Sequence, residues 1–168
     1  MNIRRAAASD AVSIAEVQVK SWQSSYKGLV DENYLQSMSI SERAVRWKEW
    51  LAAGPSHIMY VLGEDNEVAG FVSGGNIRSA HPYDSEIYAI YLLKEVQRKG
   101  YGTLLMKKFA EAMHKQGKKS MIVWVLKDNP SKQAYLSLGA KKIDKERITI
   151  GKQELFEECY AWENLPLF

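Results

Sequence analysis

Two glycines and two basic residues follow a short apolar segment near the middle of the chain. The apolar segment is residues 86–93, EIYAIYLL, and after it come Arg98, Lys99, Gly100 and Gly102. A helix that begins at such a turn presents unpaired backbone N–H groups and the positive end of its dipole. Glycine lets a ligand approach the backbone closely, and the two cations add favourable charge. The spacing therefore predicts a phosphate-binding turn between a strand and a helix.

The spacing of the glycines excludes two common phosphate loops. The dinucleotide-binding fingerprint needs a third glycine and a later acidic residue, whereas Gly102 is followed by Thr103 and Leu104. A Walker loop needs four residues between its glycines and then Gly-Lys-Ser/Thr, which this segment lacks. Taken alone, the segment also fits an ordinary surface turn with a basic helix start.

The strands that hold this turn in place are indicated by short apolar or alternating runs between turn residues. We expect strands at residues 2–6, 57–62, 68–73, 86–93, 120–126, 142–150 and 153–162. The polar residues 64–67 predict a hairpin turn, and the glycine pair 74–75 predicts a bulge or a strand end.

Four helices are expected between these strands. The first is capped by Ser9 or Asp10 and broken at residues 24–28, the second spans 41–52, and the third runs from the glycine turn to residue 115. A short fourth helix takes Asn129 as N-cap and ends at Gly139. The expected buried positions are Val12, Ile14, Ala15, Val17 and Val19 in the first helix, and Val45, Trp47 and Leu51 in the second. This order of elements predicts an α+β domain with a mixed central sheet.

Length and composition predict one globular domain over residues 1–168. The hydrophobic content of 46% and charged content of 26% are ordinary for a soluble protein with a real core. The chain has no run of about 18 apolar residues, so no membrane span is expected. Its basic start lacks the apolar part of a signal peptide. The single cysteine, Cys159, excludes an internal disulfide and fits a cytoplasmic location. The net charge of +3 is mild and dispersed, so it does not demand nucleic acid.

Two local motifs resemble those of the GNAT superfamily, the acetyl-CoA-dependent N-acetyltransferases. Residues 97–102, QRKGYG, are similar to the family's pyrophosphate loop, Gln/Arg-x-x-Gly-x-Gly/Ala. Residues 128–139, DNPSKQAYLSLG, resemble its Asn-x-x-x-x-(Phe)-Tyr-x-x-Leu-Gly element, with Ala134 replacing Phe and Leu136 replacing Glu. The resemblance covers nearly the whole chain. It implies a GNAT-like fold whose mixed, mostly antiparallel sheet is flanked by helices and splayed between the fourth and fifth strands.

The resemblance also implies an activity and a coenzyme site. The activity is acetyl transfer from acetyl-CoA to a primary amine of a small molecule, amino acid, polyamine or peptide, by direct attack in a ternary complex. The main chain of Ile90 and Leu92 would bind pantetheine, and Asn129 would contact it or serve only as a helix cap. The residues implied at the pyrophosphate are Gln97, Arg98, Lys99, Gly100, Tyr101, Gly102 and Thr103.

Two residues are candidates for the proton transfers. Tyr135 matches the family's general-acid tyrosine, which donates to the leaving thiolate; its alternative role is a helix aromatic packed in the core. Glu86 is the candidate base. A glutamate carboxyl with its ordinary pKa of about 4.3 needs burial or a water relay to deprotonate an ammonium. Its alternative is a strand-start glutamate that faces solvent. Tyr88 shares the face of Glu86 by strand period.

The resemblance further implies an acceptor pocket across the sheet from the coenzyme. Trp22 and Tyr26 are spaced i, i+4, so they share a helix face if the first helix persists that far, and they line either this pocket or the core. Tyr88 is the third residue predicted to bind substrate. His57, His81 and His114 are scattered without other ligands at metal spacing, so no metal is expected. Cys159 is interpreted as a strand residue rather than a nucleophile.

Two other functions compete with the enzyme. One is a non-catalytic acyl-CoA-binding regulatory module of the same fold. The other is a nucleic-acid binder that uses the basic residues Lys94, Arg98, Lys99, Lys107 and Lys108, although no RNP or zinc signature supports it. The enzyme interpretation is preferred, with no nucleic-acid or membrane partner. The sequence leaves open the acceptor amine and whether the chain forms a homodimer.

Overall fold

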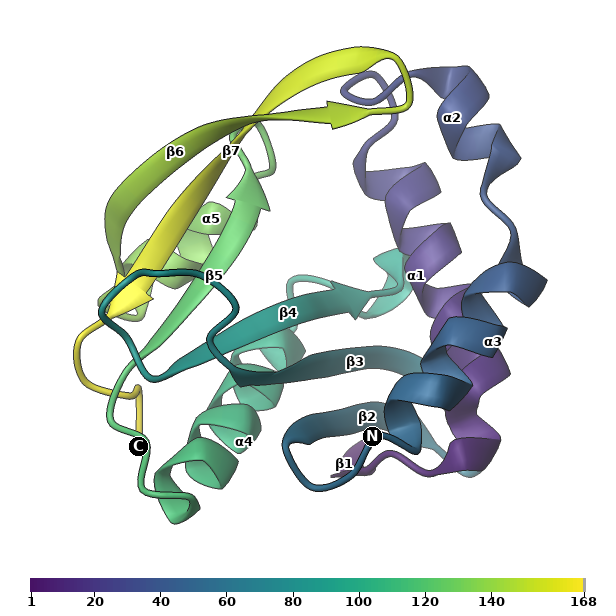
Figure 1. Cartoon of the computed structure of the whole chain (residues 1–168). Coiled ribbons are helices and arrows are strands. Elements are labelled where there is room, and N and C mark those ends of the chain that lie inside the picture. The colour runs from purple at the N-terminus through teal and green to yellow at the C-terminus, as the bar shows by residue number, and fades with distance from the viewer. Residues whose placement is uncertain (168) are drawn as a thin grey trace.

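One sheet runs through the part of the chain that the computed structural model describes, residues 1–167. Its strand order is β1-β2-β3-β4-β5-β7-β6 (Figure 1). The strands are β1 (Asn2–Arg5), β2 (His57–Glu64), β3 (Glu67–Asn76), β4 (Ser85–Leu92), β5 (Met121–Leu126), β6 (Lys141–Ile150) and β7 (Gln153–Trp162). Every neighbouring pair is antiparallel except β4 and β5, which run parallel. The predicted α+β class and mixed, mostly antiparallel sheet are confirmed.

Helices cover both faces of this sheet (Figure 1). On one face lie α1 (Ala11–Ser25) and α3 (Ile40–Leu51), packed around Phe71. On the other face lie α4 (Tyr101–Lys115) and α5 (Lys132–Ser137), packed around Phe109. The remaining helical segments are α2 (Glu32–Ser37) and two 3₁₀ turns, η1 (Ala8–Asp10) and η2 (Lys94–Val96). The two faces thus have separate cores.

Two expected core positions and one helix differ from the sequence prediction. Val12 and Val45 are 56% and 59% exposed. Each lies two residues before a buried partner, Ile14 or Trp47, and two residues turn a helix by about 200°. The helix α2 was not predicted because six residues are too few to show a helical period. It is capped by the Asp31 side chain and buries only Leu35.

A β-bulge bends β4 in its middle. Ser73 pairs with Ala89 and Gly74 pairs with Ile87, so Tyr88 is an extra residue on β4. This confirms the bulge predicted at the glycine pair. Gly74 is required there, because an added Cβ would lie 2.4 Å from the Glu86 carbonyl oxygen and 2.6 Å from the Phe109 ring. A bulge increases local twist and re-aims side chains.

The sheet opens between β4 and β5. These strands pair only from Ser85–Met121 to Ile87–Val123. Beyond that point β4 stays paired with β3, and β5 with β7, so the two halves diverge (Figure 1). The splay predicted between the fourth and fifth strands is confirmed. Beyond this point the facing edges of β4 and β5 have no partner strand, although both strands lie inside the sheet.

The start of α5 lies two residues later than predicted. Asn129 is not its N-cap; that position is Ser131, and the helix begins at Lys132. The Asn129 side chain instead accepts a hydrogen bond from the Ser131 N–H at 2.9 Å, which closes an Asx turn. The N–H groups of Lys132 and Gln133 bond three residues back, so the chain turns before α-helical pairing begins.

A buried glutamate ties α5 to the sheet. Glu158 of β7 accepts from Lys132 of α5 at 3.1 Å, from Lys142 of β6 at 2.6 Å and from the Tyr160 hydroxyl at 3.0 Å. Lys142 first, then Lys132 and Tyr160, lower the pKa of Glu158 to about 2, against the opposing effect of burial. The lowered pKa means that this cluster stabilises the fold while Glu158 is ionised.

We therefore expect Glu158→Gln to reduce the free energy of unfolding by about 1–3 kcal/mol at pH 7, as for hydrogen bonds to a charged group. The deficit should shrink as the pH falls from about 4.3, the unfolded value, towards 2, because wild type then loses the same charge. Urea unfolding of both proteins at pH 7 and pH 3 measures this. A deficit of equal size at both pH values would contradict the ion-pair explanation.

Candidate active site

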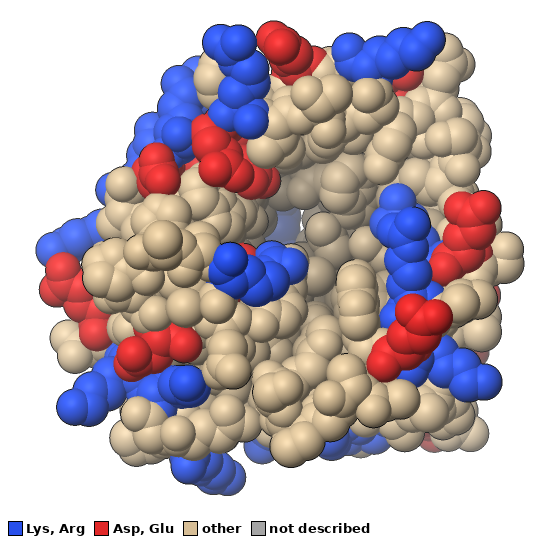
Figure 2. Space-filling view, in the orientation of Figure 1, with Lys and Arg blue, Asp and Glu red and all other residues tan. Residues whose placement is uncertain are grey.

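The splay forms the mouth of a cavity of about 520 Å³. Figure 2 shows this face of the molecule hollowed at its centre, between the β5–β7 half of the sheet and α1. Of the residues predicted from the sequence, the cavity is lined by Trp22, Tyr26, Glu86, Tyr88, Ile90, Asn129 and Tyr135. The predicted residues 97–103 do not line it; they lie at the start of α4. The predicted site thus falls into two neighbouring parts.

The edge of β4 that faces the opening carries free backbone groups. The Leu93 N–H donates to the Ala69 carbonyl on β3 at 2.8 Å. Because backbone groups alternate along a strand, those of Ile90 and Leu92 point the other way, towards the splay. The Leu92 carbonyl accepts there from Ser21 Oγ and Gln97 Nε2, each at 3.0 Å. The Ile90 groups and the Leu92 N–H remain directed at the opening, where an extended ligand can pair with them.

The start of α4 has the features of an anion site. Its N-cap is Gly100 at φ +85°, and no side chain caps the helix. The first intrahelical bond runs from the Leu104 N–H to the Gly100 carbonyl at 3.2 Å, so the preceding N–H groups point out of the helix end. Arg98 just before it has φ +59°, a conformation that costs energy for a residue with a side chain.

The two glycines of this turn have different structural roles. Gly100 is needed for its left-handed backbone. Gly102 has ordinary φ, and a Cβ there would meet only the Leu92 side chain, at 3.5 Å. The fold does not need glycine at position 102.

Tyr135 is both a core residue and a cavity residue. It is 5% exposed, and its ring lies 6.0 Å from that of Trp162 and 6.3 Å from that of Tyr160. Burial raises the pKa of Tyr135 to about 12. The hydroxyl is therefore protonated at neutral pH and able to donate a proton.

The end of α1 is fastened to the loop before α5. Asn129 Nδ2 donates to the Tyr26 hydroxyl at 3.1 Å. The rings of Trp22 and Tyr26 meet edge to face at 4.8 Å, which confirms that the helix persists far enough to place them on one side. Burial is the main reason that the pKa of Tyr26 is raised well above its usual value. Both aromatic rings form a wall of the cavity and part of a small core cluster.

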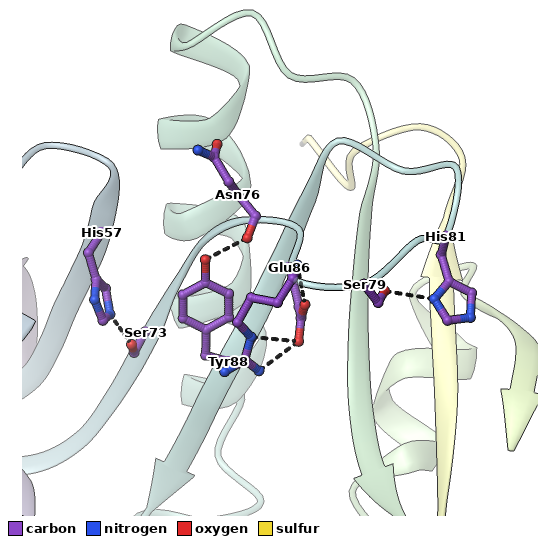
Figure 3. A network of polar contacts seen from close by, with 8 residues as sticks. His57, Ser73, Asn76, Ser79, His81, Glu86 and Tyr88 are labelled. Carbon is purple, nitrogen blue, oxygen red and sulfur yellow. Dashed lines mark hydrogen bonds and ion pairs between the residues drawn. The ribbon is translucent and has the colours of Figure 1, made fainter. Parts of the chain in front are cut away.

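Glu86 is buried rather than facing solvent, contrary to its alternative interpretation. It is 2% exposed, and its oxygens accept from the Arg78 backbone N–H at 3.0 Å and from Arg78 Nη2 at 2.7 Å (Figure 3). The Arg78 guanidinium lies over the Tyr88 ring at 4.0 Å. The Tyr88 hydroxyl donates to the Asn76 carbonyl at 2.5 Å (Figure 3). The three side chains form one network at the closed end of the splay.

Sequence reasoning missed three charged residues of the cavity. They are Arg78 from the β3–β4 loop, Glu146 of β6 and Glu157 of β7. Glu146 and Glu157 are cross-strand partners. Burial first, then Glu146, raises the pKa of Glu157 to about 7. The signal available in the sequence was strand period, which puts Glu157 in phase with the apolar residues Leu155, Cys159 and Ala161.

Two of the three histidines have structural partners, and the single cysteine is buried. His57 hydrogen-bonds Ser73 Oγ at 2.6 Å, and His81 bonds Asp144 at 2.8 Å (Figure 3 shows the first). Cys159 is a buried β7 residue, and burial raises its pKa to about 12. Within residues 1–167 no three His, Cys, Asp or Glu side chains are grouped to hold a metal ion. In the same range no helix is long and apolar enough to cross a membrane.

Comparison with known proteins places this geometry among acetyltransferases. The FR47-like protein family matches residues 76–149, which include both motifs and the open edge of β4. An N-acetyltransferase of Bacillus subtilis, YuaI, described as uncharacterised, is 36% identical over 166 residues, which are 98% of this chain and 94% of that protein.

Two solved structures share the fold over almost the whole chain. The PaiA N-acetyltransferase of Thermoplasma acidophilum, in complex with coenzyme A, matches with a TM-score of 0.74 and 23% identity, covering 94% of this chain and 96% of that one. YncA of Salmonella typhimurium, with acetyl-CoA, matches with a TM-score of 0.72 and 21% identity, covering 98% and 94%.

Proposed function

This chain belongs to the GNAT superfamily of acetyl-CoA-dependent N-acetyltransferases, and from that premise we propose its acceptor class and mechanism. The acceptor is a primary amine of a small molecule, amino acid, polyamine or peptide, and it attacks the acetyl group directly in a ternary complex. The observation that carries the proposal is the splay. It leaves a free edge on β4 beside a cavity lined by carboxylates, and the start of α4 follows β4 in the chain.

The residues on the coenzyme side fit acetyl-CoA. The open β4 edge at Ile90 and Leu92 suits the amides of pantetheine, and the uncapped start of α4 suits a pyrophosphate. Bound acetyl-CoA supplies an activated acyl carbon. The loop residues that would hold its phosphates are Gln97, Arg98, Lys99, Gly100, Tyr101, Gly102 and Thr103. The Asn129 side chain already hydrogen-bonds the Tyr26 hydroxyl and the Ser131 N–H. To bind pantetheine as well, its amide would have to make a further hydrogen bond beside these two.

The acceptor side fits a cation. Arg78 already neutralises Glu86, which leaves the charge of Glu146 and Glu157 to attract an ammonium group. Trp22, Tyr26 and Tyr88 would bind the rest of the acceptor through their rings. Cation–π contact with Trp22 or Tyr26 favours the same charge, whereas Arg78 already lies over the Tyr88 ring. Tyr135 would donate a proton to the departing sulfur.

A panel assay tests this function. Coenzyme A release and the mass of the product should show acetylation of at least one primary amine among amino acids, polyamines and peptides. The matched control is the same amine fully methylated on nitrogen, which keeps the positive charge but has no N–H to lose and should give no product. Acetyl-CoA alone should leave the mass of the protein unchanged, because no acyl-enzyme is formed. Binding of acetyl-CoA without acetylation across the panel would favour the non-catalytic module.

A further inference from the structure

We propose that Glu157 of β7 takes the proton from the acceptor ammonium, and that Glu86 is a positioning residue that holds Arg78 and Tyr88. This rests on the proposed acetylation of an amine. It differs from the prediction made from the sequence, which assigned the base to Glu86. Both residues line the cavity, so the contacts of each carboxylate and its place along the splay distinguish them.

The oxygens of Glu86 are already occupied. One accepts the Arg78 backbone N–H at 3.0 Å, and the other accepts Arg78 Nε at 3.3 Å and Nη2 at 2.7 Å. The side chain is 3% exposed in this ion pair. An acceptor ammonium would have to compete with the guanidinium for this carboxylate. Removing Arg78 would also release Tyr88, whose ring it covers.

The strand register places Glu157 at the open part of the splay. Glu86 pairs with Ile122, inside the stretch where β4 and β5 are still joined. Glu157 pairs with Leu126, beyond the last joined residue of β5, Val123. Glu157 therefore lies level with the gap that a coenzyme on the free edge of β4 would face, whereas Glu86 lies at the closed end.

The surroundings of Glu157 suit proton uptake near neutral pH. The titratable and charged groups that face it are Glu146 of β6, Glu86 and Tyr91 of β4, Arg78 of the β3–β4 loop, Tyr26 of α1 and Cys159 of its own strand. Among them only Arg78 is a cation, and it lowers the pKa of Glu157 less than burial and Glu146 raise it. The resulting pKa of about 7 is that of an efficient general base at physiological pH.

The ammonium gives one proton to the Glu157 carboxylate and becomes a neutral amine. Its lone pair forms the C–N bond to the acetyl carbonyl carbon, and the C–S bond breaks with its electron pair on sulfur. Sulfur takes the Tyr135 hydroxyl proton, and Tyr135 regains one from the nitrogen as the amide forms. Glu157 then releases its proton to solvent, so one proton is produced in each turnover.

The kinetic test compares Glu157→Gln, Glu157→Asp and Glu86→Gln, each assayed for kcat/KM against pH with an acceptor from the panel. The titration of the acceptor itself is measured and subtracted. We expect Glu157→Gln to lose about 10²- to 10⁴-fold in kcat/KM at pH 8 and to lack the acidic limb near pH 7. Glu157→Asp should retain that limb at reduced rate. Glu86→Gln should also retain it, whatever its effect on KM.

A second readout does not depend on turnover. With ¹³C-labelled glutamate, carbon NMR of the free protein should show one side-chain carboxyl that titrates near pH 7, absent in Glu157→Gln and shifted to lower pH in Glu146→Gln. Because ionisation of Glu157 costs folding stability once the pH exceeds its unfolded value, Glu157→Gln should melt at or above the wild-type temperature at pH 8. Acetyl-CoA affinity by calorimetry should not change.

Three results would overturn the assignment: native kcat/KM in Glu157→Gln, loss of the acidic limb in Glu86→Gln alone, or no carboxyl titrating between pH 6 and 8. Failure of the proposed function is distinguishable, because wild type itself would then acetylate no amine in the panel. In that case the NMR titration would still show whether the Glu157 carboxyl titrates near pH 7.

Discussion

Replacing Tyr135 by Phe is expected to reduce kcat by about 10²- to 10⁴-fold, the usual contribution of a general acid or base. The hydroxyl lies on a buried helix residue that lines the cavity, and its raised pKa keeps it protonated. Deleting it removes the proposed donor to the departing thiolate and leaves the ring against Tyr160 and Trp162. The protein should therefore stay folded and bind acetyl-CoA with nearly native affinity.

The matched control for this variant is Tyr160→Phe. Tyr160 is a second buried tyrosine beside the first, but its hydroxyl bonds Glu158 rather than lining the cavity. It should lower the unfolding free energy by about 1 kcal/mol, the cost of one hydrogen bond, with kcat almost unchanged. Stopped assays at saturating acetyl-CoA and calorimetric affinities of both variants separate the two effects. A Tyr135→Phe protein with native kcat would mean that the residue serves packing alone.

Long periodic elements were predictable from the sequence, and short ones were not. The strands 86–93 and 120–126 and the helix 101–115 carry enough apolar residues at one period to be recognised, and the structure has all three. A six-residue helix such as α2 has no period to detect. The start of α5 was misplaced because Asn129 can cap either a helix or a turn, and backbone contacts that the sequence does not reveal decide between them.

The candidate site also has parts that the sequence could indicate and parts that it could not. The turn at residues 97–103 and the segment 128–139 are contiguous, so the sequence could indicate both. The Arg78–Glu86 pair and the Glu146–Glu157 pair depend on tertiary structure. Glu157 reaches the cavity because β7 lies between β5 and β6, and nothing local in the sequence reports that strand order. Strand period puts Glu157 in phase with Leu155 and Cys159, but only the register shows that this side of β7 reaches the cavity.

The largest loss of coenzyme affinity is expected from Gly102→Asp. An added Cβ at Gly102 meets only the Leu92 side chain, at 3.5 Å, so the free protein has room for a side chain there. Aspartate in the first turn of α4 also interacts favourably with the helix dipole, so the melting temperature should be unchanged or higher. Substitution of Gly100 is a poorer test, because its φ of +85° strains any other residue.

The new carboxylate would stand where the pyrophosphate is proposed to sit. Like charges brought together in a binding site cost several kcal/mol, so calorimetry should show acetyl-CoA affinity lower by about 100-fold or more. Gly102→Asn has nearly the same shape without the charge and should lose much less. The difference between the two variants should narrow as salt is raised, because ions screen the repulsion. Equal, near-native affinities for Asp and Asn would place the pyrophosphate elsewhere and leave the α4 start as an ordinary helix end.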